Sequence, residues 1–498
     1  MRRFFGIILF AALVLPASAQ RVLSLDSCRQ MALRNNKQLG VSKLKQEVAA
    51  NLRKSARTKY LPHVSALGAY EYTSEEVSIL NDAQKGVLRN LGTSFGQNLQ
   101  QNLGPALAQM QPQTQQLVGQ TLAQSTGLLN QLGQQIIDGF RTDTRNIFVG
   151  SVLVTQPVFM GGGIMALNKM ADINERMAQN TMDVRRQATL YQIDQAYWQV
   201  VSLHHKKKLA ESYLELVKKF NADVHKMIDE GVATRSEGLS VDVKVNEAEM
   251  TLTKVDDGLV LSRMLLNQLC GLPLNEQVTL QDEETDNIAV VELTPELNVD
   301  QAVSNRPELK LLQNTVDLTK QTTNVLKAGN LPQILLTGGY AVSNPNVFNG
   351  FEKKFAGFWN VGVMIRVPLW NWGDVMYKVR ASKGATTIAS LELEEAKEKI
   401  ELQVNQMSYK VDEADKRLTL AQSSVRRADE NLRMANVGFQ EGVITPATVM
   451  EAQTAWLQAQ SQKIDAEIEV KLSQVELQKS LGLLRSTPEN VVWLKDAK

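Results

Sequence analysis

The feature that most constrains this chain is an internal repeat, because a repeated unit fixes the architecture before any single motif does. The pentapeptide Glu-Gly-Val-x-Thr occurs at 230–234 and again at 441–445, a shift of 211 residues. The same shift aligns SVLVTQPVFMGG (151–162) with GVMIRVPLWNWG (362–373), and a shift of 270 aligns YLPHVSALGAY with NLPQILLTGGY. We therefore expect two copies of one unit, the first with an insertion of 59 residues.

The N-terminus has the three parts of a secretory signal peptide. Arg2 and Arg3 precede an apolar core over 4–15, and Ala17-Ser18-Ala19 is a small-residue cleavage site. A membrane anchor is the alternative, but it needs about 20 apolar residues. We expect 1–19 to be removed before Gln20.

Charge and cysteine content exclude two classes of protein. The formal net charge is +1 and becomes −1 without Arg2 and Arg3, which gives no electrostatic case for nucleic-acid binding. Two cysteines, Cys28 and Cys270, make no disulfide framework, and a single bridge between them is left open.

Long proline-free spans predict unusually long helices. Residues 163–230 and 373–441 consist mainly of good helix formers and would each extend about 100 Å at 1.5 Å per residue. Each ends at the pentapeptide, whose glycine suits a helix C-terminus. Helices about half as long are expected at 26–58, 238–270, 298–328 and 446–481. Their lengths match a coiled coil or helical tube with the pentapeptides at one tip.

Four stretches between these helices alternate apolar and polar residues, as strands of a membrane barrel do. The residues expected to face lipid are Val64, Ala66, Tyr70, Val152, Val154, Ile334, Leu336, Tyr340, Val363 and Ile365. Open strand edges cannot lie in lipid, and barrels begin at about eight strands. Three copies of the chain would supply twelve strands.

The signal peptide, the two repeats, the strand–helix junctions PVFMGG and PLWNWG and the two tips together resemble the TolC family of outer-membrane efflux proteins, from about Val22 to Leu484. The resemblance implies a mainly α fold with membrane β: a homotrimer whose 12-stranded β-barrel lies in outer-membrane lipid and continues as a coiled-coil α-helical barrel through the periplasm of a Gram-negative cell. It implies the exit duct of a tripartite efflux or type I secretion system, with a periplasmic adaptor (membrane fusion protein) and an inner-membrane RND or ABC transporter as partners.

The resemblance also assigns roles at the two tips. The residues expected at the closed periplasmic end and at the adaptor contact are Gly231, Val232, Ala233, Thr234, Gly442, Val443, Ile444 and Thr445. Family members carry acidic rings at the positions of Thr448 and Glu451, so one ring at Glu451, favouring cations, is expected. Ile444 and Phe439 stand where the protein that names the family uses polar links, while Glu237 keeps an acid. We therefore expect apolar closure by Ile444 and Phe439.

The expected division of the chain is a first repeat over 20–272, a linker over 273–292, a second repeat over 293–485 and a tail over 486–498. The insertion, about 73–146, falls between the first two strands and is expected outside the cell. Its residues 90–137 carry no charge and show helical spacing of apolar residues with Pro112 between two series. A pair of amphipathic helices is expected, and we favour a packed surface loop over a lid.

Nothing in the sequence predicts an enzyme, a cofactor or a metal site. Adjacent histidines in HHKKK (204–208) point about 100° apart on a helix, so a solvated face is expected there. The alternative to a transport duct is a periplasmic coiled-coil scaffold without a pore, which would have no use for four amphipathic strands. The cargo (drugs, metals or proteins) is left open.

Overall fold

The structure is a computed structural model that describes residues 21–76, 78–107, 111–141, 143–285, 299–349 and 352–484. The expected signal peptide (1–19) and tail (486–498) lie outside these residues, as does part of the expected linker. The described chain forms two compact units. Unit 1 takes the residues up to Lys54, Asn168–Thr323 and the residues from Val379, and unit 2 takes Ser55–Leu167 and Asn324–Lys378.

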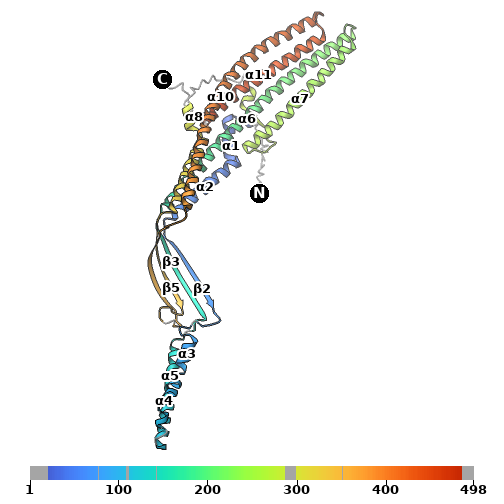
Figure 1. The fold of residues 1–498 in the computed structure, drawn as a ribbon. Helices are drawn as coiled ribbons and strands as arrows, with labels where there is room; N and C mark the ends of the chain where they lie inside the picture. Colours follow the sequence, from blue (N-terminus) through green and yellow to red (C-terminus); the bar gives the residue numbers. More distant parts are fainter. Residues whose placement is uncertain are drawn as a thin grey trace, which may run out of the picture. The chain divides into compact units, whose positions relative to one another are not determined.

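The elements follow one another as the repeat predicts (Figure 1). The first half contains β1 (Arg21–Leu23), α1 (Leu25–Asn35), α2 (Lys37–Thr58), β2 (His63–Tyr72), α3 (Asp82–Arg89), α4 (Leu91–Leu107), α5 (Pro112–Gly139), β3 (Asn146–Met160), α6 (Gly163–Asp229) and α7 (Arg235–Cys270). The second contains β4 (Val278–Leu280), the 3-10 helix η1 (Gln281–Glu284), α8 (Val299–Asn305), α9 (Pro307–Ala328), β5 (Gln333–Asn344), β6 (Ala356–Arg366), α10 (Asp374–Gln440) and α11 (Pro446–Ser480).

The two longest helices, α6 and α10, each have 67 residues, which confirms their predicted length. Glycines with positive φ stand directly before and shortly after each helix: Gly162 (81°) and Gly231 (79°) for α6, Gly373 (79°) and Gly442 (72°) for α10. A left-handed residue costs glycine little and other residues more, so these glycines set where the helices begin and end.

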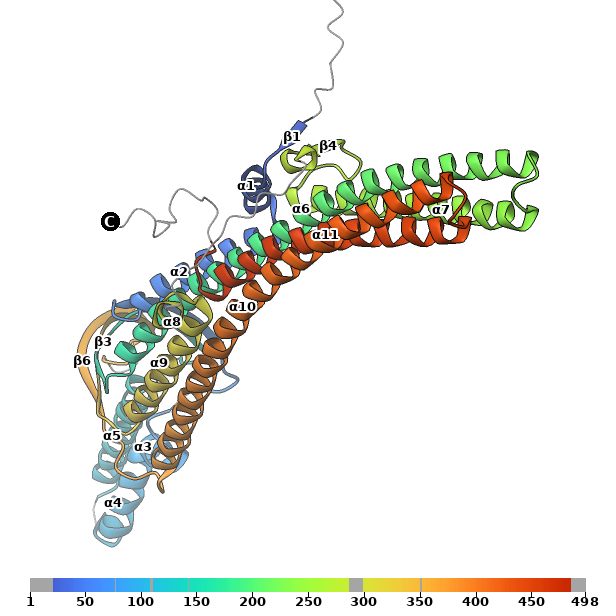
Figure 2. The ribbon, with the colours of Figure 1, turned by 90° about the horizontal axis from the view of Figure 1, so that it is seen from above.

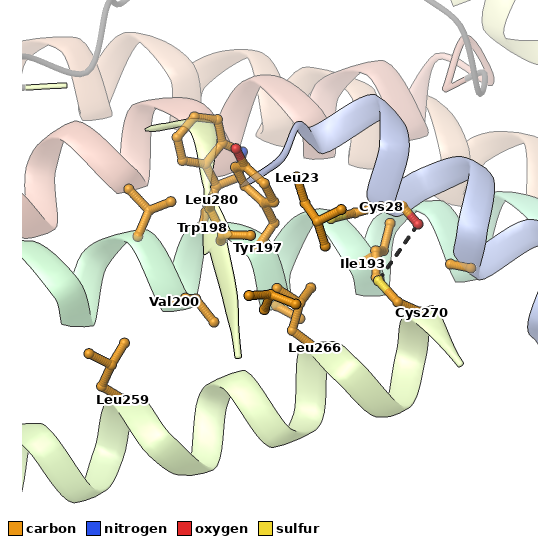
Figure 3. Packing of buried hydrophobic residues seen from close by; sticks show 14 of the residues in the cluster. Leu23, Cys28, Ile193, Tyr197, Trp198, Val200, Leu259, Leu266, Cys270 and Leu280 are labelled. Carbon is orange, nitrogen blue, oxygen red and sulfur yellow. Dashed lines mark hydrogen bonds between the residues drawn. The ribbon is translucent and has the colours of Figure 1, made fainter. Parts of the chain in front are cut away.

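One end of unit 1 is built around a core that joins α1, α6, α7 and the β1–β4 pair (Figure 3). Leu23 and Leu280 bring the parallel strands β1 and β4 onto Tyr197 of α6 and Leu266 of α7, and all four side chains are buried. The pairing of β1 with β4 was not predicted, because three-residue strands leave no periodic signal.

A buried ion pair fixes α1 against α6. The guanidinium of Arg29 donates from Nε to Asp194 Oδ1 at 2.7 Å and from Nη2 to Asp194 Oδ2 at 2.6 Å. Both side chains are buried, and the bidentate geometry satisfies both carboxylate oxygens.

Cys28 and Cys270 lie in the same core as reduced thiols. The Sγ of Cys270 contacts the carbonyl oxygen of Cys28 at 3.9 Å, the interaction drawn as a dashed line in Figure 3. The structure therefore does not join them by a disulfide.

The α6–α7 and α10–α11 hairpins lie side by side in unit 1 (Figure 2). A shared core joins them: Phe220 and Val224 from α6, Val241 from α7, and Phe439 and Val449 from α10 and α11. A second core joins α8 and α9 to α10 and α11. No helix in the part of the chain described by the structure is both long and apolar enough to cross a membrane.

Unit 2 contains one antiparallel sheet in the order β2-β3-β5-β6. A bulge interrupts β3 between Pro157 and Phe159, where proline has no N–H to donate to the ladder. The insertion between β2 and β3 folds as α3, α4 and α5, which confirms the predicted helix pair around Pro112 and adds a third, shorter helix.

Candidate functional site

The register of the sheet brings all ten strand residues that were expected to face lipid onto one face. Directly opposed residues in an antiparallel sheet point the same way. One row runs Ala66, Val152, Tyr340 and Trp359, and another runs Val64, Val154, Gly338 and Val361. Leu336 opposes Val363, Ile334 opposes Ile365, and Tyr70 opposes Phe148. Four strands from both halves of the chain therefore present one continuous apolar face.

This apolar face is solvent-exposed within one chain. Val64 is 68% exposed, Tyr340 53% and Trp359 77%, and every residue of β2 is exposed on both faces. The opposite face of the sheet carries polar side chains such as Ser65, Ser151, Thr155, Thr337, Asn360 and Arg366. A sheet that leaves this much apolar surface uncovered is expected to have a partner or a lipid surface against it.

The sheet also ends in two open edges. Within the described residues β2 pairs only with β3, and β6 pairs only with β5. Each edge presents unpaired backbone N–H and C=O groups along about ten residues, which is a template for pairing with another strand.

The first helical tip closes with a defined set of backbone hydrogen bonds. The N–H groups of Val232 and Ala233 both donate to the carbonyl of Met227, at 2.9 and 3.2 Å, and Gly231 N–H donates to Ile228. Thr234 then caps α7: its Oγ1 accepts from Glu237 N–H, and the Glu237 carboxylate accepts from Thr234 N–H at 2.7 Å.

The second tip repeats this pattern 211 residues later. The N–H groups of Val443 and Ile444 both donate to Gly438, at 2.8 and 3.1 Å, and Gly442 N–H donates to Phe439. Thr445 caps α11, and its Oγ1 lies 3.5 Å from Thr448 N. Thr448 takes the place of Glu237, so the second tip lacks the carboxylate of the first.

The structure separates the expected gate residues into three environments. Phe439 is buried, with its ring centroid 5.0 Å from that of Phe220, and Ile444 is half-buried against Gly438. Glu237 is held by its own helix cap. Thr448 and Glu451 are exposed on α11. Val232 and Val443 project into solvent at 67% and 78% exposure, so each tip offers one bare apolar side chain.

The capping role of Glu237 was missed by the sequence analysis, although the signal was present. A threonine followed three residues later by glutamate, at the start of a helix, is a capping box. The N–H of Thr234 donates to the carboxylate and holds the pKa of Glu237 below its usual value, because a hydrogen bond to the charged form favours that form.

The expected solvated face at HHKKK is wrong for His204. Its side chain is only 18% exposed and lies 3.7 Å from Glu283 and 3.9 Å from Glu284. Neither ring nitrogen of His204 has a hydrogen-bond partner within the described residues. Burial, with nearby Lys208, lowers the pKa of His204 to about 4. The segment that follows α7 packs over this face of α6, which no local pattern could have shown.

Comparison with known proteins distinguishes the transport duct from the scaffold. The chain matches the family described as "Outer membrane efflux protein" over residues 28–272 and 298–483. This chain belongs to that family. It is 22% identical to outer membrane protein TolC of Vibrio cholerae over 324 residues, which are 63% of this chain and 72% of that protein.

Solved structures of outer-membrane proteins share the fold. VceC of Vibrio cholerae matches with a TM-score of 0.69 and 13% identity, over 92% of this chain and 96% of that chain. The CmeC outer membrane channel of Campylobacter jejuni matches with a TM-score of 0.71 and 13% identity, over 93% and 86%. The expected resemblance is confirmed, and so is the mainly helical fold. The chain is an outer-membrane exit channel of tripartite efflux systems that extends into the periplasm, and its family is one of transport proteins.

Proposed function

We propose that three copies of this chain form one duct, in which three four-stranded sheets close into a 12-stranded barrel and the helices continue it as an α-helical barrel. The observation that carries the proposal is the sheet of unit 2. It has one apolar face in register across all four strands and two unpaired edges. In lipid every backbone group must be paired, so the edges have to meet strands of other copies.

The internal repeat gives a register for the joint between copies. Within one chain, β3 pairs with β5 so that Val152 opposes Tyr340. The shifts of 211 and 270 carry these two residues onto Val363 of β6 and Tyr70 of β2. If the joint between copies repeats the joint between halves, Val363 of one copy opposes Tyr70 of the next.

A paired-cysteine experiment tests this joint. Opposed Cα atoms in antiparallel strands lie about 4.5–5.5 Å apart, within the range a disulfide spans. The Tyr70→Cys/Val363→Cys variant should therefore form covalent dimers and trimers in outer membranes after mild oxidation. The matched control is Val64→Cys/Val363→Cys, because residue 64 lies six residues, about 20 Å, along β2. Cross-linking that is absent, or equal in both variants, would contradict the joint.

Exposed apolar rows on the helices also support packing between copies. Val41, Leu44, Val48 and Leu52 recur at helical spacing on α2 and are 52–63% exposed. Leu402, Tyr409 and Leu420 form a similar row on α10, with 58–76% exposure. Spacings of seven and eleven residues place such side chains on one face of a helix.

The finer assignments made from the sequence belong to this proposal. The repeats would span 20–272 and 293–485, and the tips around Gly231 and Gly442 would form the periplasmic end that meets a membrane fusion protein. An RND or ABC transporter would deliver the cargo. The bare side chains of Val232 and Val443 support an apolar adaptor contact, since they are exposed at equivalent places in the two tips.

A further inference from the structure

The insertion between β2 and β3 forms a tightly packed helical hairpin of its own. Glycines let the helix backbones approach one another: a Cβ at Gly92 of α4 would collide with the carbonyl of Thr126 in α5, and one at Gly133 of α5 with the carbonyl of Leu88 in α3. Asn130 of α5 accepts from the N–H groups of Gly92 and Thr93, at 2.8 and 3.2 Å. Such contacts indicate a fixed structure for the hairpin.

One side of this hairpin is apolar and bare. Phe95 of α4 and Leu117 of α5 line the same open groove, and they are 49% and 65% exposed. Leu128 and Leu132 continue the row along α5 at helical spacing, with 61% and 51% exposure. We call Phe95, Leu117, Leu128 and Leu132 the hairpin face.

The composition of the hairpin restricts what can cover this face. Residues 90–137 contain no charged residue, so no cation is available there to bind anionic headgroups or phosphates. They are rich in glutamine and asparagine, whose amides are costly to bury in hydrocarbon. A neutral surface with apolar side chains fits another neutral surface of the same kind.

The two ends of the insertion start from one end of the sheet. Tyr72 of β2 opposes Asn146 of β3, and Arg141 Nε donates to Glu76 at 3.1 Å across the base. Three copies in one barrel would therefore carry three hairpins on a single rim. Tethering of this kind produces local concentrations in the millimolar range without any new contact.

We propose that the α4–α5 hairpins of the three copies pack against one another through the hairpin face. The occupant of the face is a second copy of the same hairpin, and the inference rests on the proposed trimer. Burial of the four side chains replaces contact with water by contact with equivalent side chains, which is the favourable direction for apolar surface.

Single cysteines in the full-length protein in outer membranes test this packing. Leu117→Cys lies on the hairpin face, and Ala123→Cys is an exposed control about 120° away around the same helix. Cys28 and Cys270 are fully buried and serve as an internal background. We expect Leu117→Cys to form disulfide-linked dimers at least tenfold faster than Ala123→Cys, and to react more slowly with a membrane-impermeant maleimide.

Each other outcome contradicts the inference and can be distinguished from failure of the proposed function. Equal cross-linking with fast labelling at both positions would mean a bare face. Slow labelling at Leu117→Cys without cross-linking would mean that lipid or a different chain covers it. Either result in a protein of trimeric mass overturns the hairpin packing alone. A monomeric mass would overturn the proposed trimer itself.

Discussion

At the scale of single residues, the Arg29–Asp194 pair is the contact most sensitive to change. Both charges are buried, and each depends on the other for compensation. Asp194→Ala should lower the free energy of unfolding by roughly 3–5 kcal/mol, because a buried guanidinium is left unpaired. Chemical denaturation followed by circular dichroism measures this. The Arg29→Met/Asp194→Leu double variant should recover most of the loss, and a loss below about 1 kcal/mol in Asp194→Ala would show that the pair is solvated.

His204 should make stability depend on pH. Its pKa is lowered from 6.5 to about 4, so between these values the unfolded chain binds more protons than the folded one. Its contribution is present above pH 6.5 and is lost as the pH falls toward 4, by at most about 3 kcal/mol at 1.36 kcal/mol per pKa unit.

The His204→Gln variant isolates this effect. Burial raises the pKa of the neighbouring Glu283, which changes stability in the opposite sense in both proteins. The stability of His204→Gln relative to wild type should therefore rise as the pH falls from 6.5 to 4. Parallel pH curves for the two proteins would mean that His204 titrates normally.

At the scale of elements, the two tips have the same hydrogen bonds but different caps. Only the first tip uses a carboxylate, and the lowered pKa of Glu237 means that its stabilisation is present above the usual value of 4.5. Amide exchange at the start of α7 should accelerate as the pH falls below 4.5, after correction for intrinsic rates. The start of α11, with Thr448, provides the matched control, and Glu237→Gln should remove the difference. Equal pH dependence at the two tips would contradict the cap.

The elements that could be predicted are those with long periodic signals. The long helices, their glycine ends and the alternating face of the four strands were all predicted within a few residues, because 3.6-residue and two-residue periods persist over many turns or pairs. The β1–β4 pair and the burial of His204 were not, since they depend on contacts between segments far apart in the chain. Phe439 was expected at a gate and lies in a core, because apolar side chains look alike in either place.

At the scale of the whole molecule, Glu451 should influence which ions pass. It is exposed on α11 near the second tip, and within the described residues it forms no ion pair. In a trimer three copies would form one acidic ring, which favours cations. Glu451→Gln should reduce the cation preference measured as a reversal potential in planar bilayers. Thr448→Ala, one turn away and uncharged, should leave it unchanged, and an unchanged preference in Glu451→Gln would remove the ring.

The shared barrel is the central claim, and the native mass of the mature protein tests it most directly. The protein would be extracted from outer membranes in a mild detergent and its mass determined by light scattering with the detergent contribution subtracted. A mass of three chains is predicted, because the open edges of β2 and β6 have to be paired between copies. A stable monomer with its strands intact would contradict the account, since the edges would then need no partner.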